Sequence, residues 1–123
     1  MGYRSEVVLA IGKELMPHFL GVLALEPDAR TFIFKHSDCL HEDYDGENTF
    51  LVSWSDIKWY KETFLAVNAI QRFIDHCDGD EIDGLEEPWE HFRFVRLGEA
   101  TDDVEEKGCL NSNDIYISRA ISF

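Results

Sequence analysis

The segment HSDCLHEDYDGEN gathers side chains that could bind a metal ion or support catalysis. His36, Asp38, Cys39 and His41 are all possible ligands of a zinc ion. The segment is predicted to form part of a hairpin, however, where successive side chains alternate between faces, so that His41 and Glu42 point apart. An acidic, solvated turn is the simpler interpretation, and we expect neither a metal site nor a cofactor.

The second acidic segment, DGDEIDGLEEPWE at residues 78–90, comes closer to a calcium-binding loop. With Gly84 as the turn glycine of an EF-hand, Glu81, Asp83 and Glu90 would occupy ligand positions. The first ligand position would then be a glycine, which has no side-chain oxygen. The sequence leaves a metal at this loop open, but a solvated acidic loop is the expectation.

Glu105-Glu106-Lys107 has the E-x-K spacing of metal-dependent nucleases, in which carboxylates hold the ion and the lysine stabilises charge. In those enzymes the motif ends a core strand, whereas here we expect it in an acidic connection that could contain a short edge strand. The charge of the chain also opposes a DNA substrate. A metal-dependent enzyme such as a nuclease is therefore the alternative function, and we expect no catalytic residue.

The net charge is the most informative global property of the chain. Its 123 residues include 11 Lys and Arg against 25 Asp and Glu, which gives a formal charge of −14. Such a chain repels nucleic acid and anionic membranes, because its few cations are scattered along the sequence. It favours instead a protein partner with a basic surface.

Most of the carboxylates fall into three clusters, at residues 38–47, 75–90 and 99–106. Trp89 lies within the second cluster, and tryptophan often anchors protein interfaces. We expect the first two clusters to form one partner-binding surface. Its predicted residues are Glu42, Asp43, Asp45, Glu47, Asp78, Asp80, Glu81, Asp83, Glu86, Glu87, Trp89 and Glu90.

Hydrophobic periodicity predicts a single α+β domain over residues 1–123, with an antiparallel sheet and two helices on one face. The element order is β-α-β-β-α-β-β, which is ferredoxin-like with an extra C-terminal strand. Strands are predicted at 3–11, on both sides of Asp45-Gly46, at 91–97 and at 114–123, and helices at 13–25 and 62–77.

Several local features follow from residue type. Asp45-Gly46 predicts a hairpin with a type I′ turn, and a phase shift predicts a bulge near Ser55 and Asp56. Residues 29–36 favour a strand, although Pro27 and Asp28 could start a helix there.

The predicted topology has two spatial consequences. It puts the loops at 37–48 and 78–90 at one end of the sheet and the 98–108 connection at the other. It also leaves one sheet face open, which would permit a homodimer.

Cys39, Cys77 and Cys109 are odd in number and lack C-x-x-C spacing, which favours a reducing compartment. The first residues lack a basic leader followed by an apolar signal segment. The longest nearly apolar run, at 19–25, is too short to cross a bilayer. These features predict a cytoplasmic location.

Four segments, MGYRSEV, WSDIKWY, RLGE followed by DDVEEKG, and YISRAI, occur in this order along the chain. As a set they resemble the recurring signatures of a family of small proteins from tailed bacteriophages and prophages. The resemblance implies a phage protein in the bacterial cytoplasm, of a kind that often inhibits host machinery or defence. It implies no enzyme activity for particular residues.

Charge and resemblance together predict a non-catalytic, acidic inhibitor or modulator. We expect it to occupy the basic, nucleic-acid-binding surface of a host protein, as an anti-CRISPR or anti-restriction factor would.

Overall fold

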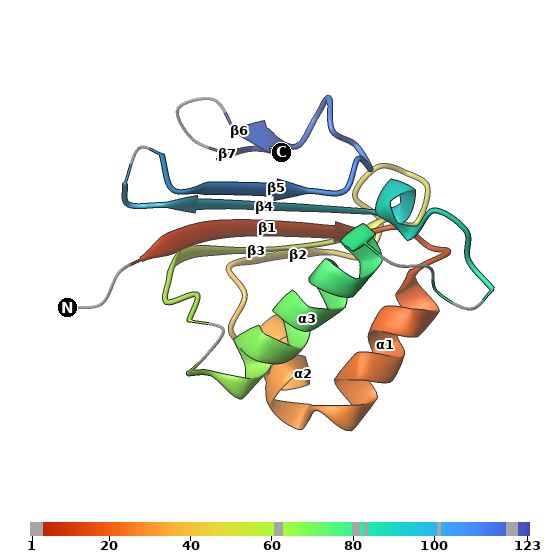
Figure 1. The fold of residues 1–123 in the computed structure, drawn as a ribbon, viewed down its shortest axis with the longest axis horizontal. Helices are drawn as coiled ribbons and strands as arrows, with labels where there is room; N and C mark the ends of the chain where they lie inside the picture. The colour runs from red at the N-terminus through yellow and green to blue at the C-terminus, as the bar shows by residue number, and fades with distance from the viewer. Residues whose placement is uncertain (1–3, 61–62, 80–81, 83, 101, 118–120) are drawn as a thin grey trace.

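The computed structural model describes residues 4–60, 63–79, 82, 84–100, 102–117 and 121–123. In this part of the chain, three α-helices pack on one face of a five-stranded antiparallel sheet (Figure 1). The elements are β1 (Ser5–Ile11), α1 (Met16–Leu25), α2 (Pro27–Phe34), β2 (Cys39–His41), β3 (Phe50–Ile57), α3 (Leu65–Gly79), the 3-10 helix η1 (Pro88–His91), β4 (Phe92–Gly98), β5 (Val104–Lys107), β6 (Tyr116–Ile117) and β7 (Ile121–Ser122). None of the described helices is long and apolar enough to cross a membrane.

Strand β1 lies at the centre of the sheet, whose strand order is β2-β3-β1-β4-β5. Val7, Leu9 and Ile11 contribute to the core beneath the helices, and Val8 and Ala10 to a second core on the other face. The strand is therefore apolar on both faces, as its nearly continuous hydrophobic sequence predicted.

The register of β1 fixes which loops share an end of the sheet. Ile11 pairs with both Phe50 and Phe92, the first residues of β3 and β4. The loops that precede these strands therefore meet at the Ile11 end, which confirms the prediction. Gly98 pairs with Ser5, so the turn after β4 lies at the opposite end. Because β5 then runs back along β4, the part of the 98–108 connection after the turn returns towards the Ile11 end.

The hairpin between β2 and β3 has the predicted partners but a different turn. Cys39 pairs with Ser53, and a longer loop at 42–49 joins the strands. Within this loop Gly46 and Asn48 have positive φ angles of 81° and 62°, whereas Asp45 does not. A type I′ turn would need positive φ at both Asp45 and Gly46, so this part of the prediction is wrong.

The predicted bulge in β3 is confirmed. Ser5 pairs with Ile57 but Val7 pairs with Trp54, so Ser55 and Asp56 together lie opposite one residue of β1. Asp56 has a φ of 52°. The bulge keeps Ile57 on the same side of the sheet as Trp54, where both contact the main core.

Residues 29–36 form most of a helix, so the preference for a strand is wrong. Pro27 stands in the first turn of α2, where its missing N–H costs nothing. Ala29 and Ile33, one turn apart, are buried against the sheet. Trp54 stacks on the Phe32 ring and donates its indole N–H to the Phe32 carbonyl at 3.2 Å. This tertiary contact outweighs the strand propensity of the segment.

The C-terminal segment also differs from the prediction of one further strand at 114–123. β5 occupies the sheet edge beside β4, and β6 and β7 pair only with each other. Figure 1 shows β6 and β7 on the sheet face opposite the helices. Ile115 and Ile121 of this segment pack there against Val8, Ala10 and Val95. Arg93 ties this segment to β4, because its side chain donates to the carbonyls of Ile115 and Gly108. The expectation of an open sheet face is therefore wrong, and it no longer supports a homodimer.

Gly108 joins β5 to the C-terminal segment in a conformation that only glycine adopts easily. Its φ is +75°, and an added Cβ would lie 2.1 Å from the Phe92 carbonyl oxygen. We predict that Gly108→Ala lowers the free energy of unfolding by about 2–4 kcal/mol, measured by urea denaturation. The matched control is Gly21→Ala in α1, where nothing lies near the added methyl group. It should raise stability by about 0.5–1 kcal/mol. Equal effects of the two substitutions would contradict the close approach at Gly108.

Candidate functional site

The carboxylates of two loops and of one helix end share the Ile11 end of the sheet. We call this set the acidic pole; its described members are Glu42, Asp43, Asp45, Glu47, Asp78, Glu86, Glu87 and Glu90. Asp78 lies in the last turn of α3, which contacts η1. Asp80, Glu81 and Asp83, which we also predicted to bind a partner, lie outside the described residues.

No arginine or lysine of the described residues forms an ion pair with a carboxylate of the acidic pole. Residues 37–57 and 73–92 contain no lysine or arginine. Among the described residues, the ion pairs of arginine and lysine involve other carboxylates, those of Asp56, Asp75, Asp103, Glu105 and Glu106. The negative potential of the pole is therefore directed to solvent.

Two of the predicted partner-binding aspartates, Asp43 and Asp45, also accept hydrogen bonds within the loop. Asp45 accepts hydrogen bonds from the Glu47 N–H at 2.9 Å, the Thr49 hydroxyl at 2.7 Å and the Asn111 amide at 3.2 Å. Asp43 accepts one from the Asn48 N–H at 2.7 Å. Burial alone would raise the pKa of Asp45, but these hydrogen bonds, Thr49 first, lower it below the ordinary 3.8.

Trp89 is the exposed aromatic residue of the pole. It lies in η1, and 38% of its surface is accessible. Its backbone is fixed, because its carbonyl accepts a hydrogen bond from the Cys109 N–H at 2.9 Å and Pro88 before it is buried. The exposed carboxylates of Glu87 and Glu90 flank it in sequence. The indole of Trp89 is thus partly exposed within an anionic surface, while the backbone that carries it is fixed.

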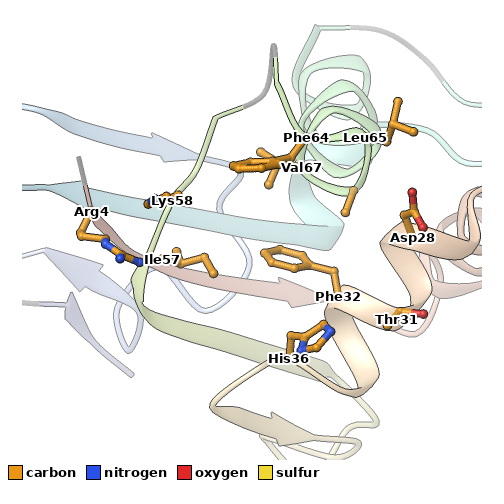
Figure 2. A pocket seen from close by; sticks show the side chains of 11 residues that line it. Arg4, Asp28, Thr31, Phe32, His36, Ile57, Lys58, Phe64, Leu65 and Val67 are labelled. Carbon is orange, nitrogen blue, oxygen red and sulfur yellow. The ribbon is translucent and has the colours of Figure 1, made fainter. Parts of the chain in front are cut away.

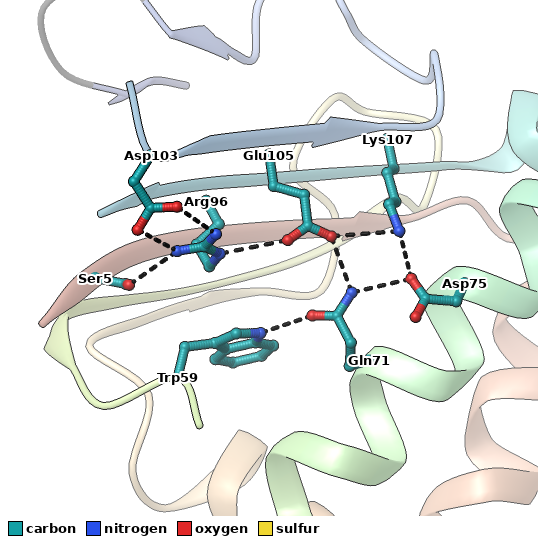
Figure 3. Close-up of polar contacts among 8 residues, drawn as sticks. All are labelled: Ser5, Trp59, Gln71, Asp75, Arg96, Asp103, Glu105 and Lys107. Atoms are coloured by element: carbon teal, nitrogen blue, oxygen red, sulfur yellow. Dashed lines mark hydrogen bonds and ion pairs between the residues drawn. The ribbon is translucent and has the colours of Figure 1, made fainter. Parts of the chain in front are cut away.

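A second polar cluster joins β4 and β5 to α3 (Figure 3). Arg96 binds Asp103 through two hydrogen bonds, of 2.8 and 3.2 Å, and lies 3.4 Å from a Glu105 oxygen. Lys107 pairs with Glu105 at 3.3 Å and also with Asp75 of α3. The hydrogen bond to Asp103 raises the pKa of Arg96. Burial would lower the pKa of Lys107, but the hydrogen bond and charge of Asp75 raise it. Both groups are therefore charged at neutral pH.

The E-x-K motif lies in this cluster on strand β5, which is the short edge strand that the sequence left open, and not in a loop. Glu105 and Lys107 extend to the same side, towards α3, as a two-residue strand spacing requires (Figure 3). Glu106 points to the other side and pairs with Arg93 at 2.9 Å. Both oxygens of Glu105 already accept bonds, from Arg96 on one side and from Lys107 and Gln71 on the other.

Gln71 lies at the centre of this cluster, although glutamine is usually exposed on a helix. It is only 2% exposed. Its carbonyl oxygen accepts the Trp59 indole N–H at 2.8 Å, and its amide donates to Asp75 and Glu105 at 3.0 Å each. The signal was available, because Gln71 follows Val67 by four residues and so shares its helix face.

Comparisons with protein-family models, with curated proteins and with solved structures found no match. The resemblance to phage proteins, and the function that it implies, stay predictions.

The three cysteines are free thiols in different environments. Burial raises the pKa of Cys77 to about 12, so this thiol is neutral and unreactive near pH 7. Of the possible zinc ligands, Cys39 and His41 lie together on β2, with the Cys39 sulfur 3.1 Å from the His41 ring. His36 lies apart from them and lines a pocket. No set of three or more His, Cys, Asp or Glu suited to a metal ion occurs among the described residues.

The pKa of Asp45 should depend on the hydrogen bonds that the carboxylate accepts within the loop. Thr49→Val removes the shortest hydrogen bond to the carboxylate, and we predict that the pKa of Asp45 rises towards its ordinary value. Because the folded pKa is depressed, the bond stabilises the fold above the unfolded pKa and ceases to do so as pH falls through the folded one. The variant should therefore be less stable at neutral pH, and this difference should shrink in acid. Carboxyl NMR titration measures the pKa, with Thr31→Val as the control; an unchanged Asp45 pKa would contradict the bond.

Gln71 should contribute to stability through its buried bond to Trp59. We predict that Gln71→Met, which keeps the volume but removes the acceptor, lowers the free energy of unfolding by about 1–3 kcal/mol. Arg72→Gln, at the exposed neighbouring position, should change it by less than about 0.5 kcal/mol. Urea denaturation followed by tryptophan fluorescence tests both. A Gln71→Met chain as stable as the original would show that the indole needs no acceptor.

Proposed function

We propose that the chain is a non-catalytic, acidic protein that binds a basic surface of another protein through its acidic pole. The carrying observation is the register of β1, which brings two acidic loops to one end of the sheet. The specific form that we propose is a phage anti-defence protein, such as an inhibitor of a CRISPR effector or restriction enzyme, which competes with nucleic acid for a basic cleft.

Proximity of the loops supports this proposal. In physiological salt the Debye length is about 8 Å, so exposed charges reinforce one another only when they are close. The Asn111 amide also bonds to Asp45, which fixes the 42–49 loop to the segment that carries Cys109 against Trp89. The carboxylates are thus held as one anionic surface, which would raise the rate of association with a cationic partner.

The exposed Trp89 favours the interpretation of the pole as a specific protein interface over its interpretation as a surface that only keeps the protein soluble. A solubilising surface needs charge but no exposed aromatic residue, whereas protein interfaces commonly centre on tryptophan surrounded by polar groups. We propose Trp89 as the anchor and Glu86, Glu87 and Glu90 as the rim of the interface. Asp43 and Asp45 support the loop and are expected to act only indirectly.

We also infer that the sheet is a variant of the predicted ferredoxin-like arrangement. β1 lies between β3 and β4 and is antiparallel to both, and the helices connect strands that are not neighbours. In this interpretation β5 is the added edge strand, in place of the C-terminal strand that the sequence predicted.

The nuclease alternative receives less support from the geometry. It needs carboxylate oxygens that are available to a metal ion, whereas both oxygens of Glu105 accept bonds within the protein. We therefore make no second proposal from the E-x-K motif.

Reversal of charge at the pole tests the proposed function. Tagged wild-type chain and the Glu86→Lys, Glu90→Lys double variant are used to capture proteins from a bacterial lysate treated with nuclease. We predict that the wild type captures nucleic-acid-binding proteins that added duplex DNA releases, and that the variant captures at least about tenfold less of them. Quantitative mass spectrometry measures the difference, and rising salt should weaken the wild-type capture.

A matched control separates position from total charge. Glu26→Lys with Asp102→Lys makes the same change in net charge away from the pole and should capture as the wild type does. Equal losses in both double variants would mean that only net charge matters. Capture that duplex DNA does not release would contradict occupation of a nucleic-acid-binding surface.

A further inference from the structure

A pocket of about 450 Å³, shown in Figure 2, is lined by Arg4, Ile57 and Lys58. These residues lie at the Ser5–Ile57 end of the sheet, opposite the acidic pole. The pocket is bounded by α2, by the end of β3 and by the start of α3. This volume falls in the range of sites that hold small organic ligands. Its apolar lining comes mainly from Phe32, Ile57, Phe64 and Val67.

Aromatic rings line the pocket from two elements. Phe32 of α2 is held in place because its ring stacks on Trp54 with centroids 4.7 Å apart. Phe64 precedes α3, stacks on Tyr60 and is 42% exposed. Figure 2 shows both rings directed into the space between the helices. Such surfaces suit a flat aromatic ligand, which gains contact on both sides at little entropic cost.

The polar groups of the pocket are divided by charge. Arg4 and Lys58 lie on one side and Asp28 and Thr31 on the other, with His36 below (Figure 2). Among the described residues, Lys58 has no ion-pair partner, while Arg4 donates to the Asp56 carbonyl at 3.2 Å and lies 3.9 Å from the Asp56 carboxylate. A cationic side is notable in a chain of charge −14. It provides charge complementarity for an anionic group at that side only.

We propose that this pocket binds a small aromatic anion, with its ring between Phe32 and Phe64 and its carboxylate or phosphate against Lys58 and Arg4. A ligand with a hydrogen-bond donor at its far end would reach the carboxylate of Asp28. This site is separate from the acidic pole and does not depend on the proposed function. It adds a small-molecule ligand to a protein whose opposite end is anionic.

Two fluorescent probes of the same shape test the proposal with the intact chain. Anilinonaphthalene sulfonate is an aromatic anion, and N-phenylnaphthylamine is its neutral counterpart. We predict saturable binding of one molecule of the anion. Lys58→Gln should weaken the anion about fivefold to tenfold and leave the neutral probe unchanged. Phe64→Ala should weaken both probes, because it removes a wall of the pocket.

Controls at matched exposed positions exclude general effects of charge or hydrophobicity. Lys35→Gln and Phe34→Ala remove the same side-chain types from α2 and its end without altering the pocket lining, and both should bind as the wild type does. Circular dichroism verifies that each variant is folded. Equal affinity for both probes, or loss of binding in the control variants, would overturn the proposal.

Competition then identifies the anionic group. Displacement of the bound probe by naphthoate but not by adenosine monophosphate assigns a carboxylate ligand, and the reverse assigns a phosphate. Displacement by neither compound at millimolar concentration would overturn the proposal, since both carry the required ring and charge.

Discussion

Pairing of β1 along both of its edges is the constraint on which the rest of the structure depends. Its side chains alternate between two cores, so a slip of one residue against either neighbour would exchange Val7 and Leu9 for Val8 and Ala10. The same register pairs Ile11 with the first residues of β3 and β4. Core packing and the position of the acidic loops are therefore set by one set of backbone hydrogen bonds.

The distribution of the few cations makes the surface more polarised than composition alone implies. Arg93, Arg96 and Lys107 pair with carboxylates of β5, its preceding turn and α3, on the two faces of the β4–β5 edge. These pairs join elements within the protein, and none of them involves a carboxylate of the acidic pole. Lys58 and Arg4 lie at the opposite end, beside the pocket. Lys58 has no ion-pair partner among the described residues, so it remains available to a ligand of the pocket.

The sequence was sufficient where local pattern and tertiary packing agree. Strand β1 and the bulge after Trp54 could be predicted, because the phase of buried residues alone determines them. Helix α2 could not, since Thr31 and Phe32 favour a strand and the stack on Trp54 that holds the helix joins residues far apart in sequence. The C-terminal segment alternates like a strand, but β5 takes the edge beside β4, and β6 and β7 form a separate two-stranded sheet. Edge competition of this kind is not visible in a local pattern.

The candidate site shows why a count of acidic residues predicts a surface only in part. Asp45 and Glu86 look equivalent in the sequence, yet Asp45 accepts three hydrogen bonds from its own chain and Glu86 accepts none among the described contacts. An aspartate's short side chain reaches nearby backbone N–H groups, whereas a glutamate extends farther from the backbone and more readily remains solvated. A basic partner must therefore compete with internal donors at Asp43 and Asp45 but only with water at the glutamates. We therefore expect the proposed binding surface to be the part of the pole formed by Glu42, Glu47 and the residues around Trp89.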